Sequence, residues 1–149
     1  TASLIANSSK AIGVLSDVDQ DSLKSLYFFG RQLGLAFQVV DDILDFTGND
    51  EQLGKPAASD LQSGYLTAPV FYALEENPNL SELINAKFSK KDDLDKALFI
   101  VRDSNAIEKS RNLAEKFASE SKESISWLPD SPSKKALLKL PEFVISRLY

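Results

Sequence analysis

The chain has 149 residues, of which 43% are apolar and 26% charged, and its formal net charge is −5. This length allows one domain with a sizeable core, and the acidic balance argues against an electrostatic nucleic-acid binder. The sequence has no Cys and no His, which excludes disulfides, thiolate or imidazole zinc sites, Cys nucleophiles and every Ser-His-Asp mechanism. Any chemistry must therefore use carboxylates, lysine, arginine, amides or hydroxyls.

The hydrophobic periodicity is helical nearly throughout, so we expect an all-α fold in a single domain over residues 1–149. A first helix should end near Asp17 or Asp19, either of which can cap the next one. A long second helix is predicted over about residues 22–46, followed by a glycine-containing loop over 47–66 with at most one short helical turn. Further helices are predicted over residues 67–76, 80–87, 91–102, 106–127 and 133–149, with a kink or restart at Pro141 in the last.

The opening "TASLIANSSKAIGVL" has the mixture of apolar and small residues found in the middle of a packed helix. With no Met anywhere in the sequence, we expect the chain to be a piece of a longer protein. No apolar run approaches the ~18 residues of a membrane span, and no signal-peptide pattern opens the chain.

The stretch "GLAFQVVDDILDF" places three aspartates in the most apolar part of the sequence, where an unpaired carboxylate is costly. At ~100° per residue, Asp45 lies about 40° and Asp42 about 100° from Asp41 around the helix. Gln38 lies about 60° from Asp41. Four oxygen-bearing side chains therefore share roughly a quarter of the helix circumference.

Gly30 and Gly34 fall on the same arc, which suggests a polar trough with a floor of glycine. Carboxylates this close repel one another, so in a half-buried setting they take up protons or bind a cation. Ligands that are all oxygen favour Mg²⁺ or Mn²⁺ over zinc, and Mg²⁺ typically fills its remaining positions with water and phosphate oxygens. The trough therefore predicts a site for a metal-bridged phosphate.

A solvated helix face is the ordinary explanation of a DDxxD pattern, and a helical scaffold with only solvated aspartates is the alternative from another class. Two features favour a ligand here. The aspartates come late in the helix, where the macrodipole disfavours anions, and their flanks are apolar. "KKDDLDK" at 90–96 has a similar acid count among lysines at a predicted helix start, and there we expect capping and solvation.

The block "GRQLGLAFQVVDDILDF", followed by "LGKP" and "SDL", resembles the second aspartate-rich region of the trans-prenyl diphosphate synthases. The variant is most similar to the long-chain polyprenyl branch that makes quinone side chains. The opening "TASLIANS" resembles the stretch that follows a Lys-Thr pair in this family. The resemblance runs from Thr1 to about Leu74 and implies the C-terminal part of the isoprenoid-synthase helical bundle.

The family resemblance implies a mechanism in which Mg²⁺ holds an allylic diphosphate between two facing aspartate-rich helices. Diphosphate departs, and isopentenyl diphosphate attacks the allylic cation to lengthen the chain. The resemblance assigns direct magnesium binding to Asp41, with Asp42 and Asp45 acting directly or through its water.

Three further residues receive roles from the same resemblance. Gln38 matches the polar residue beside the metal-bound substrate, and Lys55 matches a lysine that contacts the allylic diphosphate and neutralises the leaving group. Thr1 matches the threonine of the Lys-Thr pair. Tyr65 stands where many relatives have lysine, so one cationic contact is missing.

The first aspartate-rich motif of the family lies upstream of Thr1, so we expect the chain to be about the C-terminal half of a subunit and inactive alone. Its expected partners are the N-terminal half, further subunits in a homodimer or heteromer, and a membrane surface reached through the product. A quinone-side-chain enzyme of a eukaryote suggests the mitochondrion. A non-catalytic regulatory subunit is the alternative, and a class I terpene cyclase is disfavoured because its second metal motif differs.

Smaller candidates carry less weight. Asp60 fits a loop cap better than a metal network, and Phe37 fits the core better than a cavity wall. Trp127 and Tyr149 are expected to be packing and terminal residues. Arg147 lies where some relatives place basic residues near the diphosphate, but the match around it is short.

Overall fold

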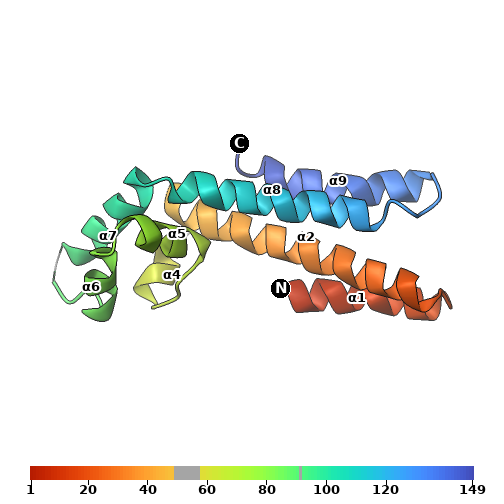
Figure 1. Cartoon of the computed structure of the whole chain (residues 1–149), viewed down its shortest axis with the longest axis horizontal. Coiled ribbons are helices and arrows are strands. Elements are labelled where there is room, and N and C mark those ends of the chain that lie inside the picture. The colour runs from red at the N-terminus through yellow and green to blue at the C-terminus, as the bar shows by residue number, and fades with distance from the viewer. Residues whose placement is uncertain (49–57, 91) are drawn as a thin grey trace. The chain divides into compact units, whose positions relative to one another are not determined.

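The computed structural model describes residues 1–48, 58–90 and 92–149, and in these ranges the regular elements are helices (Figure 1), which confirms the all-α prediction. The elements are α1 (Ala2–Leu15), α2 (Gln20–Thr47), α4 (Ser59–Gln62), α5 (Ala68–Glu76), α6 (Leu80–Asn85), α7 (Asp93–Asp103), α8 (Ala106–Ser124) and α9 (Pro132–Ser146). The chain forms two compact units, Thr1–Val40 with Leu113–Tyr149, and Asp41–Asn112. We call them unit 1 and unit 2 and describe each by itself; the single domain stays a prediction.

The start of α2 follows the predicted capping chemistry. The Asp19 carboxylate accepts hydrogen bonds from the backbone N–H of Asp21 at 2.9 Å and of Ser22 at 3.0 Å. The Ser22 hydroxyl donates to the same carboxylate at 2.7 Å. These bonds, those from Ser22 first, hold the pKa of Asp19 below its ordinary value. An N-cap of this kind satisfies donors that the helix leaves unpaired.

The glycines of α2 belong to a helix–helix contact in unit 1, where α1 runs alongside α2 (Figure 1). A Cβ atom on Gly34 would lie 2.5 Å from the Ala2 Cα, and one on Gly30 would lie 2.5 Å from the Ile5 carbonyl oxygen. The expectation of an open glycine-floored trough is therefore wrong. The backbone of α1 occupies that space, and glycine is needed because only it allows two backbones to approach this closely.

Helix α8 packs in unit 1 through small and polar residues. Within unit 1 the buried Ser121 hydroxyl donates to the Phe29 carbonyl at 3.0 Å. The buried Gln32 amide donates to the Glu120 carboxylate. Every buried polar atom in these pairs therefore has a partner, which removes most of its desolvation cost.

Helix α9 begins at Ser131, whose hydroxyl accepts the Lys134 N–H at 3.1 Å, and the first helical residue is proline. The helix does not restart at Pro141 but continues to Ser146. The Pro141 ring is buried, and this burial offsets part of the cost of the missing helical hydrogen bond.

The hydrophobic core of unit 2 includes the side chain of Phe46 near the end of α2, which is completely buried. The other buried members of this core come from the helices of the unit and from the cap of α4: Ala58, Leu61, Val70, Ala73, Leu80, Ala97, Val101 and Ala106. This core holds the C-terminal end of α2, whose last two turns carry the aspartates.

Candidate functional site

The aspartates of α2 do not lie on a solvated face. Asp45 is 1% exposed and Asp42 7% exposed, while Asp41 is half-buried. All three have polar interactions within the protein. A buried carboxylate without polar partners is costly, so these interactions stabilise the aspartates inside the protein. The alternative of a helical scaffold whose aspartates are only solvated is therefore wrong for Asp42 and Asp45.

Asp45 joins the end of α2 to the start of α4. Its carboxylate accepts the Ser59 hydroxyl at 3.1 Å and the Asp60 backbone N–H at 3.2 Å. Its backbone carbonyl accepts the Ala58 N–H at 2.8 Å, where Ala58 has a left-handed backbone with φ of 55°. Asp45 therefore positions α4, a contribution that needs no metal ion. Asp60 takes part in this contact through its backbone N–H, and the loop cap expected of its side chain stays a prediction.

Two of the residues predicted to bind substrate are neighbours in unit 1. The Thr1 hydroxyl donates to the Gln38 side-chain carbonyl at 3.3 Å, which fixes the exposed amide of Gln38. Phe37 is half-buried, and the Arg147 guanidinium lies 4.8 Å from the centre of its ring. Such a stack holds a cation over an aromatic face, so the structure gives Arg147 a partner that its sequence context did not indicate.

Arg102 is a positioning residue that the sequence analysis missed. Its Nε donates to the Phe46 carbonyl at 2.8 Å. That carbonyl is among the last four of α2, which have no partner inside the helix. A cation at this end also interacts favourably with the helix dipole. The sequence signal was a basic residue in the last turn of α7, but its partner is 56 residues away in the chain.

Of the remaining residues singled out in the sequence, some lie among the described residues and one does not. Lys55 lies outside the described residues. Tyr65 is 66% exposed. Trp127 is partly exposed, and the Tyr149 hydroxyl donates to the Glu115 carboxylate at 3.4 Å.

Within residues 1–48, 58–90 and 92–149, no three acidic side chains converge as a metal-binding group. For the α2 aspartates we attribute this to Asp45, whose carboxylate bonds α4. The oxygen chemistry of Asp41 and Asp42 still fits Mg²⁺, which takes one or two carboxylates and completes its shell with water and phosphate oxygens. The aspartates therefore suit one side of a shared site and do not form a closed cage.

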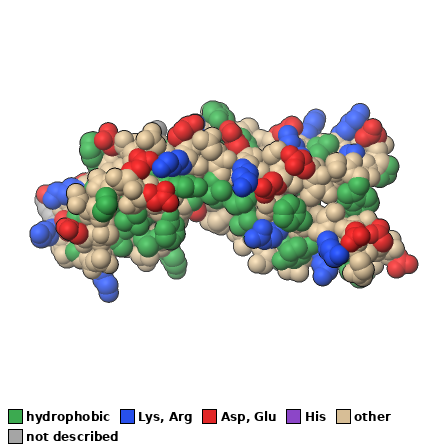
Figure 2. Space-filling view, viewed as in Figure 1, with side chains coloured by type: hydrophobic (Ala, Val, Ile, Leu, Met, Phe, Trp, Pro, Cys, Tyr) green, Lys and Arg blue, Asp and Glu red, His purple; other side chains and the backbone are tan. Residues whose placement is uncertain are grey.

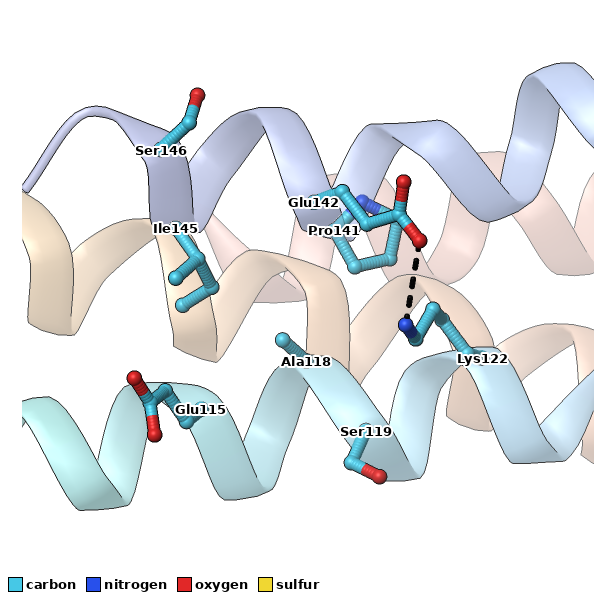
Figure 3. A pocket seen from close by; sticks show the side chains of 8 residues that line it. All are labelled: Glu115, Ala118, Ser119, Lys122, Pro141, Glu142, Ile145 and Ser146. Atoms are coloured by element: carbon cyan, nitrogen blue, oxygen red, sulfur yellow. Dashed lines mark hydrogen bonds and ion pairs between the residues drawn. The ribbon is translucent and has the colours of Figure 1, made fainter. Parts of the chain in front are cut away.

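The groove between α8 and α9 is a poor alternative for an anionic ligand (Figure 3). It has a volume of about 400 Å³, and Pro141 and Ile145 of α9 face Ala118 of α8. Its one cation, Lys122, is already paired with Glu142 at 3.3 Å. The Glu115 carboxylate also lines the groove, so the site would repel a diphosphate.

Comparison with known proteins places the chain in a family. Residues 1–101 match the family model described as polyprenyl synthetase. The chain belongs to the polyprenyl synthetase family. It is similar to a prenyl transferase of Cyanophora paradoxa, with 52% identity over the whole chain and 46% of the relative covered.

Long-chain synthases are among the relatives. The chain is 45% identical to solanesyl diphosphate synthase 2, chloroplastic, of Arabidopsis thaliana, with 99% of the chain and 36% of the relative covered. It is 42% identical to a probable mitochondrial hexaprenyl pyrophosphate synthase of Neurospora crassa, with 99% of the chain and 33% of the relative covered. The chain thus spans half or less of the length of these relatives, as the sequence analysis expected.

Solved structures of polyprenyl synthases are similar to this chain in fold. Heptaprenyl diphosphate synthase from Staphylococcus aureus matches with a TM-score of 0.89 and 32% identity, over 96% of this chain and 46% of that one. A polyprenyl synthase from Caulobacter crescentus, complexed with calcium and isoprenyl diphosphate, matches with a TM-score of 0.85 and 32% identity, over 98% of this chain and 46% of that one. No helix among the described residues is long and apolar enough to cross a bilayer.

Proposed function

We propose that this polyprenyl synthetase chain forms the second aspartate-rich wall of an active site that lengthens an allylic diphosphate with isopentenyl diphosphate. The product is a long-chain polyprenyl diphosphate. The observation that carries the proposal is the burial of Asp42 and half-burial of Asp41 at the end of α2. Their position at the negative end of the helix dipole is unfavourable for anions, which fits residues kept for a cation.

Each proposed residue has a physical task. Asp41 and Asp42 would hold Mg²⁺, with Asp45 contributing through water while it fixes α4. A bound Mg²⁺ supplies neutralisation of the charge that develops on the departing diphosphate. Gln38, held by the Thr1 hydroxyl, orients a substrate oxygen. Lys55 contributes a further positive charge to the leaving group.

Two features of the relatives support this proposal. The Caulobacter structure contains a divalent cation together with an isoprenyl diphosphate, and named relatives make solanesyl or hexaprenyl chains. The mitochondrial location stays a prediction, since the relatives include a chloroplastic protein as well as a mitochondrial one.

A non-catalytic subunit of a heteromeric synthase is the second candidate. The exposed Tyr65 favours it, because the cation that many relatives have at this position is missing. Asp41, Asp42 and Gln38 argue against it, because the proposed cation and substrate contacts need all three residues, whereas Asp45 also serves to attach α4.

The experiment uses a complete subunit, in which the part of the family's length that this chain does not span is fused to the chain or co-expressed with it. We expect Asp41→Ala to lower incorporation of labelled isopentenyl diphosphate by about 10²–10³-fold, as loss of a transition-state charge partner does. Asp92→Ala, which removes an exposed aspartate of α7's cap, is the matched control and should leave incorporation unchanged.

Circular dichroism of both variants shows whether the helices persist. Normal incorporation by Asp41→Ala would overturn the metal role. If the unmodified complete subunit shows no turnover and instead raises the activity of a second synthase chain, the non-catalytic subunit is correct.

A further inference from the structure

A groove between α6 and α7 in unit 2 has an apolar floor and an acidic rim. Its volume is about 540 Å³, which is within the range of specific binding sites. The lining residues are Asn79, Glu82 and Leu83 of α6 and its cap, and Asp92, Asp95, Lys96, Phe99 and Ile100 of α7 and its cap. Ser59 and Asp60, which bond the Asp45 carboxylate, are not among them.

The apolar part of the groove is centred on a large exposed side chain. Phe99 is 67% exposed, while Leu83 and Ile100 are half-buried beside it. The buried face of α7 is formed by Ala97 and Val101, so Phe99 is not needed for the core of unit 2. Figure 2 shows hydrophobic side chains gathered on one face of this unit. An exposed aromatic residue in an apolar groove is typical of a protein-binding surface.

The charges on the rim select the partner. Glu82, Asp92 and Asp95 contribute three carboxylates against the single cation of Lys96. Among the described residues none of these four groups forms an ion pair. The rim is therefore free to pair with cations of a partner, and such complementarity decides specificity and association rate.

Two other occupants are disfavoured by the same charges. A second copy of this chain carries a net charge of −5 and would meet the acidic rim with like charge. A membrane surface is anionic and would be repelled. A basic helix fits in length as well as charge, because α7 has 11 residues and so spans about 16 Å, the length of three turns.

We propose that the α6–α7 groove binds a basic amphipathic helix of a partner protein, whose apolar side chains cover Phe99 and whose lysines or arginines pair with the acidic rim. Recognition of this kind places apolar anchors at i, i+3, i+4 and i+7 in a groove. The proposal does not depend on the prenyl-transfer function, because it uses none of the residues assigned to it.

The test measures the binding of fluorescein-labelled 14-residue peptides to the chain by fluorescence anisotropy. The probe carries leucines at i, i+3, i+4 and i+7 and lysines elsewhere, and the control peptide has glutamates in place of the lysines. We expect the lysine peptide to bind and the glutamate peptide to bind at least about tenfold more weakly.

Matched variants locate the binding. Phe99→Ala should weaken the lysine peptide about tenfold or more, whereas Phe143→Ala, which removes an equally exposed phenylalanine of α9 (67%), should not. Asp95→Lys should weaken it about fivefold or more. Glu108→Lys makes the same charge change in the first turn of α8 and should have little effect. Circular dichroism shows whether each variant is folded.

Three results would overturn the proposal. Equal weakening by Asp95→Lys and Glu108→Lys would mean attraction by net charge alone. Equal effects of Phe99→Ala and Phe143→Ala would mean non-specific apolar binding. Loss of peptide binding when the part of the family's length that this chain does not span is co-expressed would show that the groove is occupied by the rest of the same subunit.

Discussion

The aspartates of α2 and those at the start of α7 form two clusters of three within unit 2. Each cluster has one deeply buried member, Asp45 at 1% exposure and Asp93 at 4%. Each of these accepts a backbone N–H, from Asp60 at 3.2 Å and from Lys90 at 3.0 Å. Burial of a single aspartate is therefore explained in both clusters by the fixing of a neighbouring chain segment.

The difference lies in the other members. Asp92 and Asp95 are exposed at a helix start, where the dipole favours anions. Asp42 is buried and Asp41 half-buried near a helix end, where the dipole opposes them. The number of acidic residues alone does not indicate a ligand. An acidic cluster indicates one when further members, beyond the one that holds a neighbouring segment, are buried where the helix dipole disfavours anions.

The largest effect on the free energy of unfolding is expected at Gly34, in the part of α2 that precedes its three aspartates. Gly34→Ala would place a Cβ atom 2.5 Å from the Ala2 Cα, and relieving this overlap should lower the free energy of unfolding by about 3 kcal/mol. Urea unfolding measures it. Adding Ala2→Gly should recover little of the loss, because it removes the Cβ atom at 3.1 Å but keeps the Cα atom at 2.5 Å. Unchanged stability in Gly34→Ala would mean that this face of α2 is open, and the functional surface would then extend beyond the aspartates.

A smaller difference should separate the two buried aspartates. Asp45→Ala removes an acceptor with two donors and should cost about 2–3 kcal/mol of unfolding free energy, against about 1 kcal/mol for Asp93→Ala with its single donor. Ser59→Ala, which removes only the hydroxyl donor, should cost less than Asp45→Ala. Equal losses in urea unfolding of the two aspartate variants would contradict the attachment of α4 through Asp45.

The smallest effect is expected for Glu76, an exposed acidic residue outside both aspartate clusters, with which their buried members can be compared. Lys109 lies 2.8 Å from Glu76 and, together with the Asn105 N–H, holds the pKa of Glu76 below its ordinary value of 4.5. A lowered carboxyl pKa gives stability that is present above pH 4.5 and is lost as the pH falls through the folded pKa. The stability difference between the chain and Lys109→Ala should therefore be constant from pH 6 to 8 and shrink below pH 4.5. If the stability difference between the two proteins grew below pH 4.5, the Lys109 contact would not lower the pKa of Glu76.

Much of the fold could be predicted because helical periodicity and capping are local. The second helix was predicted over about 22–46 and is found at Gln20–Thr47. The cap at Asp19 and the proline start of α5 after Thr67 were predicted from short-range chemistry alone. At Pro141 a kink or a restart was expected: α9 continues past this proline to Ser146 without a restart, and the kink stays a prediction.

The site was harder to predict because its partners are distant in the chain. Angles around a single helix showed that Gly34 and Asp41 share a face, but not that α1 covers the glycine. The burial of Asp93 was missed for the same reason: solvation and capping were expected for "KKDDLDK", but Asp93 is buried and accepts the Lys90 N–H, and the N-cap residue Asp92 forms no side-chain cap hydrogen bond. The roles of Asp41, Asp42, Gln38 and Lys55 in catalysis stay predictions.

The double attachment of Asp45 has a consequence for variation in length. Its carbonyl and its carboxylate bind Ala58, Ser59 and Asp60, so the residues that lead into α4 are held at the end of α2. Because the entropy of closing a loop grows only slowly with its length, by about 0.6 kcal/mol for each doubling, residues inserted between these anchor points would burden folding little. An insertion between Asp45 and Ala58 should therefore leave α4 in its position.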